Sequence, residues 1–574
     1  MNAIDLHVHS TYSDGTMTPA ELLKLAEETG LAAFALTDHD ATKGLDEILA
    51  LSASSPVEVV PGIEITTAVP GKDIHILGYY INYHRPELQE FLKDLVWKRE
   101  DRNRRMCERL HDAGLSITYD ALRASVSPNT ILTRMHFARF LLNAGDVSSL
   151  DEAFNRYLGD RCPTYVHREK VLPEDAVRII RKVGGVPVLA HPILYGFSDE
   201  KLEHLVASLK DAGLAGIETV YSTYRAADER QIRSLADRYD LIMTGGSDFH
   251  GSNKPLIKLG KGMGKLFIPE EFLDNIKAEY LRNYSCSPQK SDKADSEATF
   301  RNADIPAPVP GLLTFDMDGT LLDDHKQITP KTREALEKAI RKGYRFTIST
   351  GRPLTSILRL VDSLDLRKYN PLISAFNGGC IYDLNEEKLL YKEVLDKETA
   401  ETIKEIALSH GLHFHTYTER EVISERDTEE VRYYSKYVSL EYRVCNNVLE
   451  EEPCPYKIII MHLTDRSKLE EVQEEVLKRL SGRVQCLFSN NTFLEMIPVS
   501  SGKDVALRKM CETEGIPFEQ SYAFADQDND ITMLRASAHG VALVNGSTGA
   551  KKAAGYITFL DNNHDGLVPF LEAL

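Results

Sequence analysis

The sequence predicts an α/β protein with two separate domains, each built on strands that end in histidine or carboxylate side chains. The chain has 574 residues, more than one hydrophobic core usually organises. Short apolar runs alternate with helical patterns, which indicates parallel sheets. Residues 285–309 form a polar stretch followed by closely spaced prolines, as in a linker. We therefore expect domains over residues 1–284 and 310–574.

Composition is that of an ordinary globular protein, with 42% hydrophobic and 27% charged residues. The net charge of −19 argues against binding to long nucleic acid, which needs a basic surface, but allows small phosphorylated ligands held by a few cations. No secretory signal and no membrane-spanning run is apparent. Eight scattered cysteines argue against disulfides and thiolate metal sites. We expect a cytoplasmic protein with no membrane partner, and its oligomeric state stays open.

In the first half, apolar runs end repeatedly in residues that can bind metals. Asp5, His7 and His9 share one face of the first expected strand, because side chains alternate along a strand. Later runs end in or carry Thr37-Asp38-His39-Asp40, Glu64, His75, His191-Pro192, Glu218 and Ser247-Asp248-Phe249-His250. A lone histidine of this kind is more often hydrogen-bonded than metal-bound, but the repetition favours a multinuclear site. Imidazole and carboxylate ligands without thiolate suit Zn, Mn or Fe.

Helical patterns separate most of these runs. One helix has a full start signal, with Thr18 as N-cap, Pro19 at its first position and Glu21 three residues on, and it ends at Gly30. Functional residues gathered at the carboxyl ends of strands are typical of β/α barrels.

These motifs resemble the polymerase and histidinol phosphatase (PHP) superfamily over about the first 280 residues. The resemblance rests on Asp5-Leu-His7-Val-His9, Asp14-Gly15, Thr37-Asp38-His39-Asp40, Glu64, His75, His191-Pro192 and Asp248-Phe249-His250. It implies a distorted β/α barrel with two or three divalent metals (Mn, Zn or Fe). The implied ligands are His7, His9, Asp14, His39, Glu64, His75, His191, Asp248 and His250. Glu64 would bridge metals, and Asp5 and Asp38 would orient the histidines from outside the ligand set.

Residues from about 85 to 170 differ, because their pattern is helical. We expect a helical insertion over the barrel mouth. A charged run within it contains Arg102 and Arg105, which we take as candidate substrate contacts. For any single arginine of this run, a solvent-exposed helix face is the alternative.

Arg134 and His136 are stronger candidates for binding a phosphate. A guanidinium group on such an insertion can hold a phosphate through two hydrogen bonds. The arrangement resembles one PHP branch, the stand-alone nucleotide phosphatases and exonucleases that act on short RNA or 3′,5′-bisphosphonucleotides.

The second half carries another set of residues at strand ends. The set is Asp316, Asp318, Thr350, Lys503, Asp526, Asn529 and Asp530. Asp316 as a nucleophile needs Mg²⁺ and cations around the phosphate, because anions repel each other. Asp318 can act as general acid, Thr350 and Lys503 can contact the phosphate and the carboxylates, and Asp526 can complete the Mg²⁺ shell. Gly502-Lys503 is not a Walker loop, since Asp504 replaces the required Ser or Thr.

In chain order these pieces resemble the four motifs of the haloacid dehalogenase (HAD) superfamily over residues 310–574. The resemblance implies a Rossmann-like core, Asp316 as nucleophile, Asp318 as acid/base, and Asp316, Asp318, Asp526 and Asp530 around Mg²⁺, with Asn529 as a substrate contact. An interval of about 384–490 leaves room for an inserted α/β cap, which is similar to the Cof-type branch acting on sugar phosphates, pyridoxal phosphate or flavin mononucleotide. One departure is Ala525, where the family usually has Gly.

The combined interpretation is a bifunctional phosphoesterase. The N-terminal head would hydrolyse nucleotide phosphates or short RNA, and the C-terminal head a small phosphomonoester. The alternative is one active head with the other half serving as a sensor of a phosphorylated ligand.

Overall fold

The computed structural model describes residues 3–69, 72–128, 130–159, 161–166, 171–286, 311–418 and 420–574. Contacts between Cα atoms group residues 1–283 into one compact unit and residues 284–574 into a second. The linker expected at 285–309 lies almost entirely outside the described residues. In the described parts of the chain, no helix is long and apolar enough to cross a membrane.

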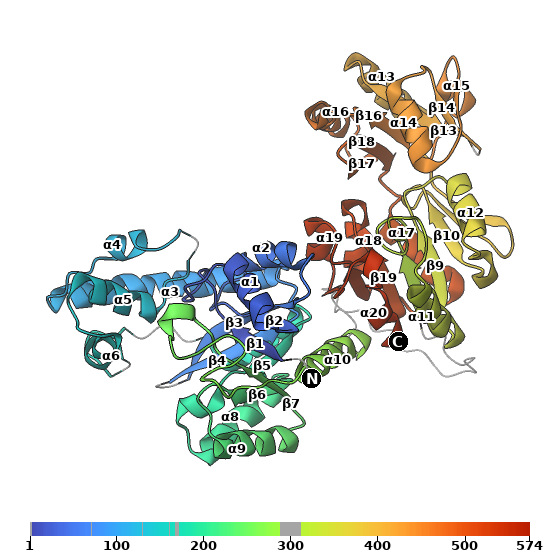
Figure 1. Ribbon diagram of the computed structural model, residues 1–574. Helices are drawn as coiled ribbons and strands as arrows, with labels where there is room; N and C mark the ends of the chain where they lie inside the picture. Colours follow the sequence, from blue (N-terminus) through green and yellow to red (C-terminus); the bar gives the residue numbers. More distant parts are fainter. Residues whose placement is uncertain are drawn as a thin grey trace, which may run out of the picture. The chain divides into compact units, whose positions relative to one another are not determined.

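The first unit is organised around a seven-stranded sheet that curls nearly into a barrel (Figure 1). In order across the sheet the strands are β1 (Ile4–Val8), β2 (Ala33–Leu36), β3 (Glu58–Val69), β4 (Lys72–Tyr79), β5 (Val186–Leu189), β6 (Gly216–Tyr221) and β7 (Ile242–Gly246). Only β4 runs antiparallel to its neighbours. Beyond β7 the chain returns to β1, where Asp248 N donates to His7 O (2.9 Å) and His9 N to Phe249 O (3.0 Å). The expected distorted β/α barrel is confirmed.

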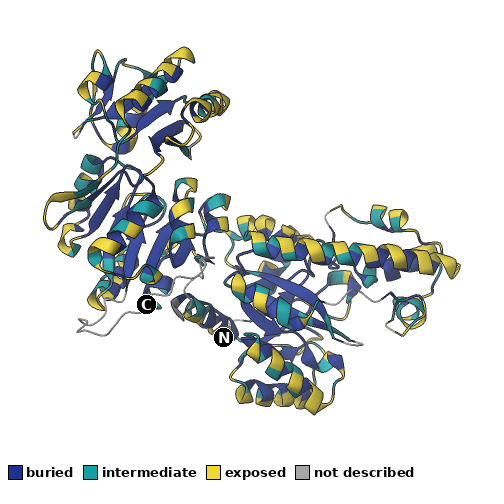
Figure 2. Ribbon diagram, turned by 180° about the vertical axis from the view of Figure 1, so that it is seen from behind, coloured by how far each residue is buried: buried dark blue, intermediate teal, exposed yellow. Residues whose placement is uncertain are grey.

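Helices cover the outside of this barrel. They are α1 (Pro19–Thr29), α2 (Lys43–Ser52), α7 (Pro173–Lys182), α8 (Asp199–Asp211), α9 (Ala226–Arg238) and α10 (Glu271–Cys286), with short 3₁₀ turns η2 (Pro192–Tyr195) and η3 (Gly251–Asn253). The predicted start of α1 is present, because Thr18 and Glu21 form a reciprocal capping box and Gly30 ends the helix at φ 75°. Figure 2 shows the strands in the buried colour and the outer helix faces exposed.

The helical insertion expected near 85–170 forms a layer with its own core. Its elements are α3 (Pro86–Asp112), α4 (Tyr119–Ala124), α5 (Arg134–Ala144), α6 (Leu150–Ala153) and the π-helical turn η1 (Phe154–Leu158). Met106, Leu110, Phe137 and Leu141 are fully buried in this core. Arg99 of α3 ties the layer to the barrel, since it donates to Asp40 and to Thr66 Oγ1 (3.1 Å).

Gly246 is the point at which β7 meets β1 most closely. A Cβ atom there would lie 2.1 Å from His7 Cβ and 2.7 Å from His7 N. We expect Gly246→Ala to lower the free energy of unfolding by about 1–3 kcal/mol, because neither strand can yield without opening the barrel. Chemical denaturation followed by circular dichroism measures this change. Gly264→Ala is the comparison: a Cβ at Gly264 meets no atom within 4 Å, so its loss of stability reports only the strain of an alanine at a φ of 99°. Equal losses in both variants would contradict the close-packing argument.

The second unit has an eight-stranded core sheet. Across the sheet the order is β12 (Lys388–Lys392), β11 (Cys380–Asp383), β10 (Leu372–Ala375), β9 (Arg345–Ser349), β8 (Leu312–Phe315), β19 (Ser521–Ala525), β20 (His539–Ala542) and β21 (Tyr556–Ile557). From β10 to β21 the strands are parallel. The chain order reverses between β8 and β19, which is where ligands bind in open α/β sheets. The Rossmann-like core is confirmed.

Helices and short turns connect these core strands. They are α11 (Pro330–Arg341), α12 (Leu354–Ser363), η4 (Arg367–Tyr369), α17 (Lys503–Glu514), η5 (Phe518–Gln520), η6 (Asp528–Asp530), α18 (Ile531–Ala536), α19 (Thr548–Ala553), η7 (Asn562–His564) and α20 (Val568–Glu572). Buried residues of α17, among them Leu507 and Met510, pack in the same cluster as Leu312 of β8 and Ala523 of β19.

A six-stranded sheet with helices forms the inserted cap. Its strand order is β15 (Tyr442–Val444), β14 (Val422–Ser424), β13 (His413–Tyr417), β16 (Ile458–Met461), β18 (Phe493–Pro498) and β17 (Val484–Asn490), with α13 (Lys397–Ser409), α14 (Glu429–Val438), α15 (Val448–Glu451) and α16 (Arg466–Arg479). The expected bounds of about 384–490 are wrong at both ends. β12 pairs with the core strand β11, whereas β18 pairs within the cap.

Candidate active sites

The nine predicted ligands of the first unit come together at one end of its barrel. Most of them lie at or just after the ends of strands: His7 and His9 at the end of β1, His39 after β2, His191 after β5, and Asp248 and His250 after β7. Glu64 lies within β3 and His75 within β4. Asp14 lies on the loop after β1. His191 and Asp248 have positive φ angles of 26° and 58°. Such conformations cost roughly 1–3 kcal/mol each and are held where the surroundings fix them.

Glu64 lies at the centre of the cluster. Its Oε2 is 3.0 Å from His39 Nδ1, 3.3 Å from His9 Nε2 and 3.4 Å from His7 Nε2. Its Oε1 is 2.7 Å from His75 Nδ1 and 3.1 Å from His191 Nε2. Each carboxylate oxygen therefore faces a different set of imidazoles, as a ligand that bridges metal ions would.

Asp14 and Asp248 flank this centre. His250 Nε2 is 3.1 Å from Asp14 Oδ1, and Asp248 Oδ1 is 3.3 Å from both His9 Nε2 and His250 Nδ1. The side chains form four groups, and within each group the possible ligand atoms lie within 4.8 Å of one another. The groups are His9, Asp14, His39 and His250; His7, His9 and Asp248; His7, Glu64 and His191; and His39, Glu64 and His75.

The unsatisfied atoms of the cluster fit metal ions. Among the described residues no hydrogen-bond partner reaches His7 Nε2, His9 Nε2, His39 Nδ1, Asp14 Oδ1 or Glu64 Oε2, although all are buried. Buried polar atoms are normally paired, so atoms of this kind that face one another fit a site that binds cations. The donor set is nitrogen and carboxylate oxygen, which suits Zn, Mn or Fe.

Glu218 of β6 supports two of the ligands. Its Oε1 is 3.1 Å from His7 Nδ1, and its Oε2 accepts the backbone N–H of His191 at 2.7 Å. A carboxylate on the far nitrogen of an imidazole fixes the ring and strengthens it as a ligand. The sequence pattern marked Glu218 as able to bind a metal, but it did not predict its contact with His7, which is 211 positions away in the chain.

Asp5 and Asp38 hold backbone next to the ligand histidines, and their expected role in orienting the rings stays a prediction. Asp5 accepts backbone N–H groups of Ser247 and Gly260, each at 2.8 Å. Asp38 accepts from Ser10 N (2.8 Å) and from the Ser10 and Ser13 hydroxyls. Both carboxylates therefore fix the backbone that carries the ligands. Asp5 Oδ1 also accepts the N–H of His7 at 3.3 Å, and Ser13, which donates to Asp38, has its Oγ 3.5 Å from His9 Nδ1.

Glu218→Gln is expected to weaken metal binding by about 10- to 100-fold, since the variant loses the charge that supports His7. Titration calorimetry with Mn²⁺ measures this, and the melting temperature of the metal-free protein checks that the fold persists. Glu200→Gln, at an exposed position of α8, is the matched control. Unchanged Mn²⁺ affinity in Glu218→Gln would contradict the supporting role.

The insertion residues differ in how far they reach toward this cluster. Arg134 pairs with Asp73 (3.2 Å), two residues before His75 on the same face of β4. Burial lowers the pKa of His136, and the negative charge of Asp14 acts in the opposite direction on the same ring. Its Nδ1 accepts the N–H of Thr133 at 3.0 Å, so the neutral ring carries its proton on Nε2.

The contacts that the structure gives for Arg102 and Arg105 lie within the insertion. Arg102 is buried in α3, with Nη1 3.6 Å from Met106 Sδ. Arg105 is half exposed and pairs with Asp101 (2.8 Å) one helical turn away. Arg105 therefore lies on an exposed helix face, which was the alternative to a substrate contact, and its guanidinium group pairs with the carboxylate of Asp101 on the same face.

The second unit gathers another buried set at the ends of β8 and β19. Lys503 Nζ donates to Asp316 Oδ1 (2.6 Å) and to Asp530. Asp316, Asp526 and Asp530 present oxygens within 4.8 Å of one another. Burial, followed by the charge on Asp530, raises the pKa of Asp526 to about 6. Three buried carboxylates against one lysine leave negative charge uncompensated, and this fits a divalent cation with oxygen ligands such as Mg²⁺.

Asp318 does not join this carboxylate set. Arg352 holds it through two hydrogen bonds, Nε to Oδ2 at 2.6 Å and Nη2 to Oδ1 at 2.8 Å, and Lys326 adds a third at 2.7 Å. Burial opposes ionisation, but Arg352 outweighs it and the pKa of Asp318 falls to about 2. The candidate ligand group of the described residues is Asp316, Asp526 and Asp530, and the expectation that Asp318 also binds the metal stays a prediction. Arg352, in the Thr350-Gly351-Arg352 motif, is the residue that the sequence interpretation left without a role.

Thr350 fixes the loop that carries Arg352, and Asn529 connects the core to the cap. The buried Thr350 lies at the end of β9, where its Oγ1 accepts the N–H of Arg352 (3.2 Å). Asn529 Nδ2 donates to Asn377 Oδ1 (3.3 Å), and Asn377 Nδ2 donates to Glu495 of β18 (2.7 Å). The loop carrying Asp526 and Asp530 is thus joined to a cap strand.

Comparison with known proteins agrees with both halves. Residues 5–162 match the model of the PHP domain, and residues 313–571 match that of haloacid dehalogenase-like hydrolases. A 3′,5′-nucleoside bisphosphate phosphatase of Chromobacterium violaceum is 37% identical over 251 residues, which are 44% of this chain and 88% of that protein. A 5′-3′ exoribonuclease of Haemophilus influenzae is 34% identical over 247 residues, 43% of this chain and 89% of that protein.

The C-terminal half has relatives of its own. A 5-amino-6-(5-phospho-D-ribitylamino)uracil phosphatase of Bacillus subtilis is 28% identical over 288 residues, 46% of this chain and 97% of that protein. Both halves thus match hydrolases of phosphoric esters, and the resemblance drawn from the motifs is confirmed. The chain belongs to the PHP family through its N-terminal half and to the haloacid dehalogenase-like hydrolases through its C-terminal half.

Proposed function

We propose that the protein is a bifunctional phosphoesterase with one active site in each unit. The observation that carries the proposal is the presence of two complete buried ligand sets, Glu64 with its imidazoles and Asp316 with Lys503, Asp526 and Asp530. A chain with one active head and one ligand sensor would not need a set of buried metal-binding side chains in both halves. The domain division at 1–284 and 310–574 is part of this proposal.

The N-terminal head acts on nucleotide phosphates or short RNA. The names of its relatives support this substrate class, and so do Arg134, which pairs with Asp73 on the strand that carries His75, and the Nε2–H of His136 near Asp14. Mn, Zn or Fe bound by the nine ligands would neutralise phosphate charge and lower the pKa of water. Arg134 holds a phosphate oxygen of the substrate, and the ligand imidazoles stay neutral and fixed.

The C-terminal head hydrolyses a small phosphomonoester of the sugar phosphate, pyridoxal phosphate or flavin mononucleotide type through a covalent intermediate. Asp316 attacks phosphorus, the P–O bond to the leaving alcohol breaks, and Asp318 delivers a proton to that oxygen. Because Arg352 and Lys326 hold the pKa of Asp318 at about 2 in the free site, this step needs the incoming phosphate to draw those cations away so that Asp318 is first protonated. Water then cleaves the aspartyl phosphate and returns the proton to Asp318. Mg²⁺ held by Asp316, Asp526 and Asp530 would offset the charge that meets the incoming phosphate.

A substrate panel tests the proposal. Phosphomonoesters, nucleoside bisphosphates and short 5′-phosphorylated RNAs are assayed with the full chain, with Asp316→Asn and with His7→Ala/His9→Ala. Each hydrolysed substrate should be lost in one variant and kept in the other. A panel in which neither variant loses any activity would overturn both site assignments.

A further inference from the structure

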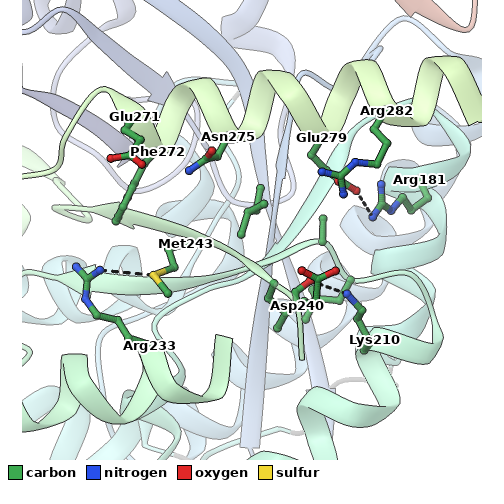
Figure 3. Close-up of a pocket in the computed structure, with 14 residues that line it drawn as sticks. Arg181, Lys210, Arg233, Asp240, Met243, Glu271, Phe272, Asn275, Glu279 and Arg282 are labelled. Carbon is green, nitrogen blue, oxygen red and sulfur yellow. Dashed lines mark hydrogen bonds and ion pairs between the residues drawn. The ribbon is translucent and has the colours of Figure 1, made fainter. Parts of the chain in front are cut away.

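Two clusters of charged side chains lie outside the candidate active sites. One lines a cavity of about 440 Å³ at the barrel end where β6 and β7 begin (Figure 3). There Arg181 and Arg282 share the carboxylate of Glu279, and the two arginine side chains are 24% and 65% exposed. Solvent screens charges of this kind, so their pairing contributes little. The other cluster, in the cap of the second unit, is closed to solvent and contacts loops of the candidate active site.

Lys457 and Glu495 form this buried ion pair. Lys457 Nζ lies 2.9 Å from Glu495 Oε2, and the side chains are 1% and 4% exposed. Lys457 directly precedes β16, and Glu495 belongs to β18, the strand that pairs with β16 (Figure 1), so both lie on one face of the cap sheet. Desolvating two charges is costly, and a well-packed apolar pair in such a place is often as stable or more so. Stability alone therefore does not explain the pair.

Lys457 also holds the loop that carries Arg352. Its Nζ donates to the backbone carbonyl of Gly351 at 2.7 Å. The next residue, Arg352, grips Asp318 through two hydrogen bonds. On the other side of the loop the packing is close, because a Cβ at Gly351 would lie 2.8 Å from Asn377 Oδ1. A cap lysine thus fixes the peptide group next to the arginine that contacts the proposed proton donor.

Glu495 reaches a second loop of the site through Asn377. Its Oε2 accepts from Asn377 Nδ2 (2.7 Å) as well as from Lys457. Asn377 Oδ1 in turn accepts from Asn529 Nδ2 (3.3 Å), and Asn529 lies in η6 next to Asp530. One carboxylate oxygen in the cap therefore connects the arginine loop with the turn that carries a candidate metal ligand.

We propose that Lys457 and Glu495 are positioning residues of the C-terminal head. They hold the loop of Arg352 and the turn of Asn529 in the arrangement that phosphoryl transfer needs, and they act through these groups rather than on the substrate. This inference rests on the proposed function, in which Asp318 delivers a proton to the leaving oxygen. A misplacement of about 1 Å can cost about 100-fold in rate, so residues outside the reacting set can have effects of this size.

Arg352 serves two steps of the proposed reaction, and both need its loop in place. It holds Asp318 in the free site, and it moves to the incoming phosphate when the substrate binds. A displaced loop should therefore weaken the phosphate contact and also misplace the proton donor. Leaving groups isolate the second effect, because an alkoxide needs a proton as it departs whereas a nitrophenolate does not.

The test compares glycerol 2-phosphate with p-nitrophenyl phosphate on the Mg²⁺-loaded full chain, with the rates of Asp316→Asn subtracted. The measured quantity is kcat/KM, which covers the steps up to departure of the leaving group. Lys457→Met should lower kcat/KM for glycerol 2-phosphate at least about tenfold further than that for p-nitrophenyl phosphate. Glu495→Gln should act in the same direction. Lys478→Met, at an exposed position of α16 in the cap, is the matched control and should change neither value.

A double variant separates position from stability. Lys457→Met/Glu495→Gln leaves neither buried charge without its partner, so its melting temperature should exceed that of either single variant. Its kcat/KM for glycerol 2-phosphate should stay as low as in Lys457→Met, because the Gly351 carbonyl still lacks its donor. Recovery of the rate together with the melting temperature would overturn the positioning role.

Further outcomes separate this inference from the proposed function. Equal losses with both probes, or no loss in Lys457→Met, would overturn the inference and leave the phosphatase assignment standing. A full chain that hydrolyses neither probe nor any phosphomonoester of the substrate panel would refute the proposed function of this head. Hydrogen exchange then decides the inference: Lys457→Met must speed exchange at residues 350–352 and 528–530 if the pair holds them, and unchanged exchange would overturn it.

Discussion

Asp316→Asn is expected to lower turnover by the C-terminal head about 10⁴-fold or more, while the N-terminal head keeps its full rate. The amide is isosteric but cannot form an aspartyl phosphate, and removing a covalent nucleophile has effects of this size or larger. The variant also leaves Lys503 Nζ, 2.6 Å away, with a neutral partner. Initial rates on acetyl phosphate with Mg²⁺, compared with rates on a nucleoside bisphosphate with Mn²⁺, measure both heads in one preparation.

A matched exchange keeps this result interpretable. Asp362→Asn removes an exposed carboxylate that pairs with Arg367 (2.9 Å), and surface pairs contribute about 0–1 kcal/mol. It should leave both activities within twofold. Trapping with a metal fluoride that mimics a phosphoryl group should stabilise the wild type and fail in Asp316→Asn. A residual rate in Asp316→Asn close to that of the wild type would exclude Asp316 as nucleophile.

The ligand residues were predictable because each follows or lies in a local strand pattern. His7, His9 and Asp316 stand at the carboxyl ends of buried strands, and parallel strands bring such ends to one edge of a sheet. Local strand patterns therefore singled out the metal-capable residues, whereas the assignment of the nine ligands was implied by the family resemblance. A local pattern also predicted α1, whose capping box lies between Thr18 and Glu21.

Residues whose roles depend on distant partners were not predictable. Glu218 meets His7 across 211 positions of sequence, and Arg352 reaches Asp318 only because β9 lies next to β8. Periodicity shows that a residue lies on a strand but not which side chain faces it. The cap boundary failed for the same reason, because β12 and β18 have similar strand patterns and differ only in the sheet they join.

His7→Ala/His9→Ala is expected to lower hydrolysis of nucleotide phosphates by the N-terminal head about 10³-fold, with the C-terminal head unaffected. The two rings contribute to three of the four groups of ligand atoms, and both face Glu64 Oε2 within 3.4 Å. Losing them removes charge stabilisation of several kcal/mol, and about 1.4 kcal/mol corresponds to a tenfold rate change. Metal content measured by mass spectrometry should fall by at least one ion per chain.

The control is His111→Ala/His204→Ala, which removes two exposed imidazoles from the same unit. It should keep metal content and rate, because neither ring lies in the cluster. Truncating two buried rings beside Glu64 also leaves cavities that lower stability. Circular dichroism of the metal-free proteins therefore shows whether the variant has lost only its ligands or its fold as well. If the ligand variant retains its metals and its rate, the cluster around Glu64 is a hydrogen-bonded core rather than a catalytic metal centre. If it loses its metals but retains its rate, the hydrolysis belongs to the head that carries Asp316, and the N-terminal proposal fails while the C-terminal one stands.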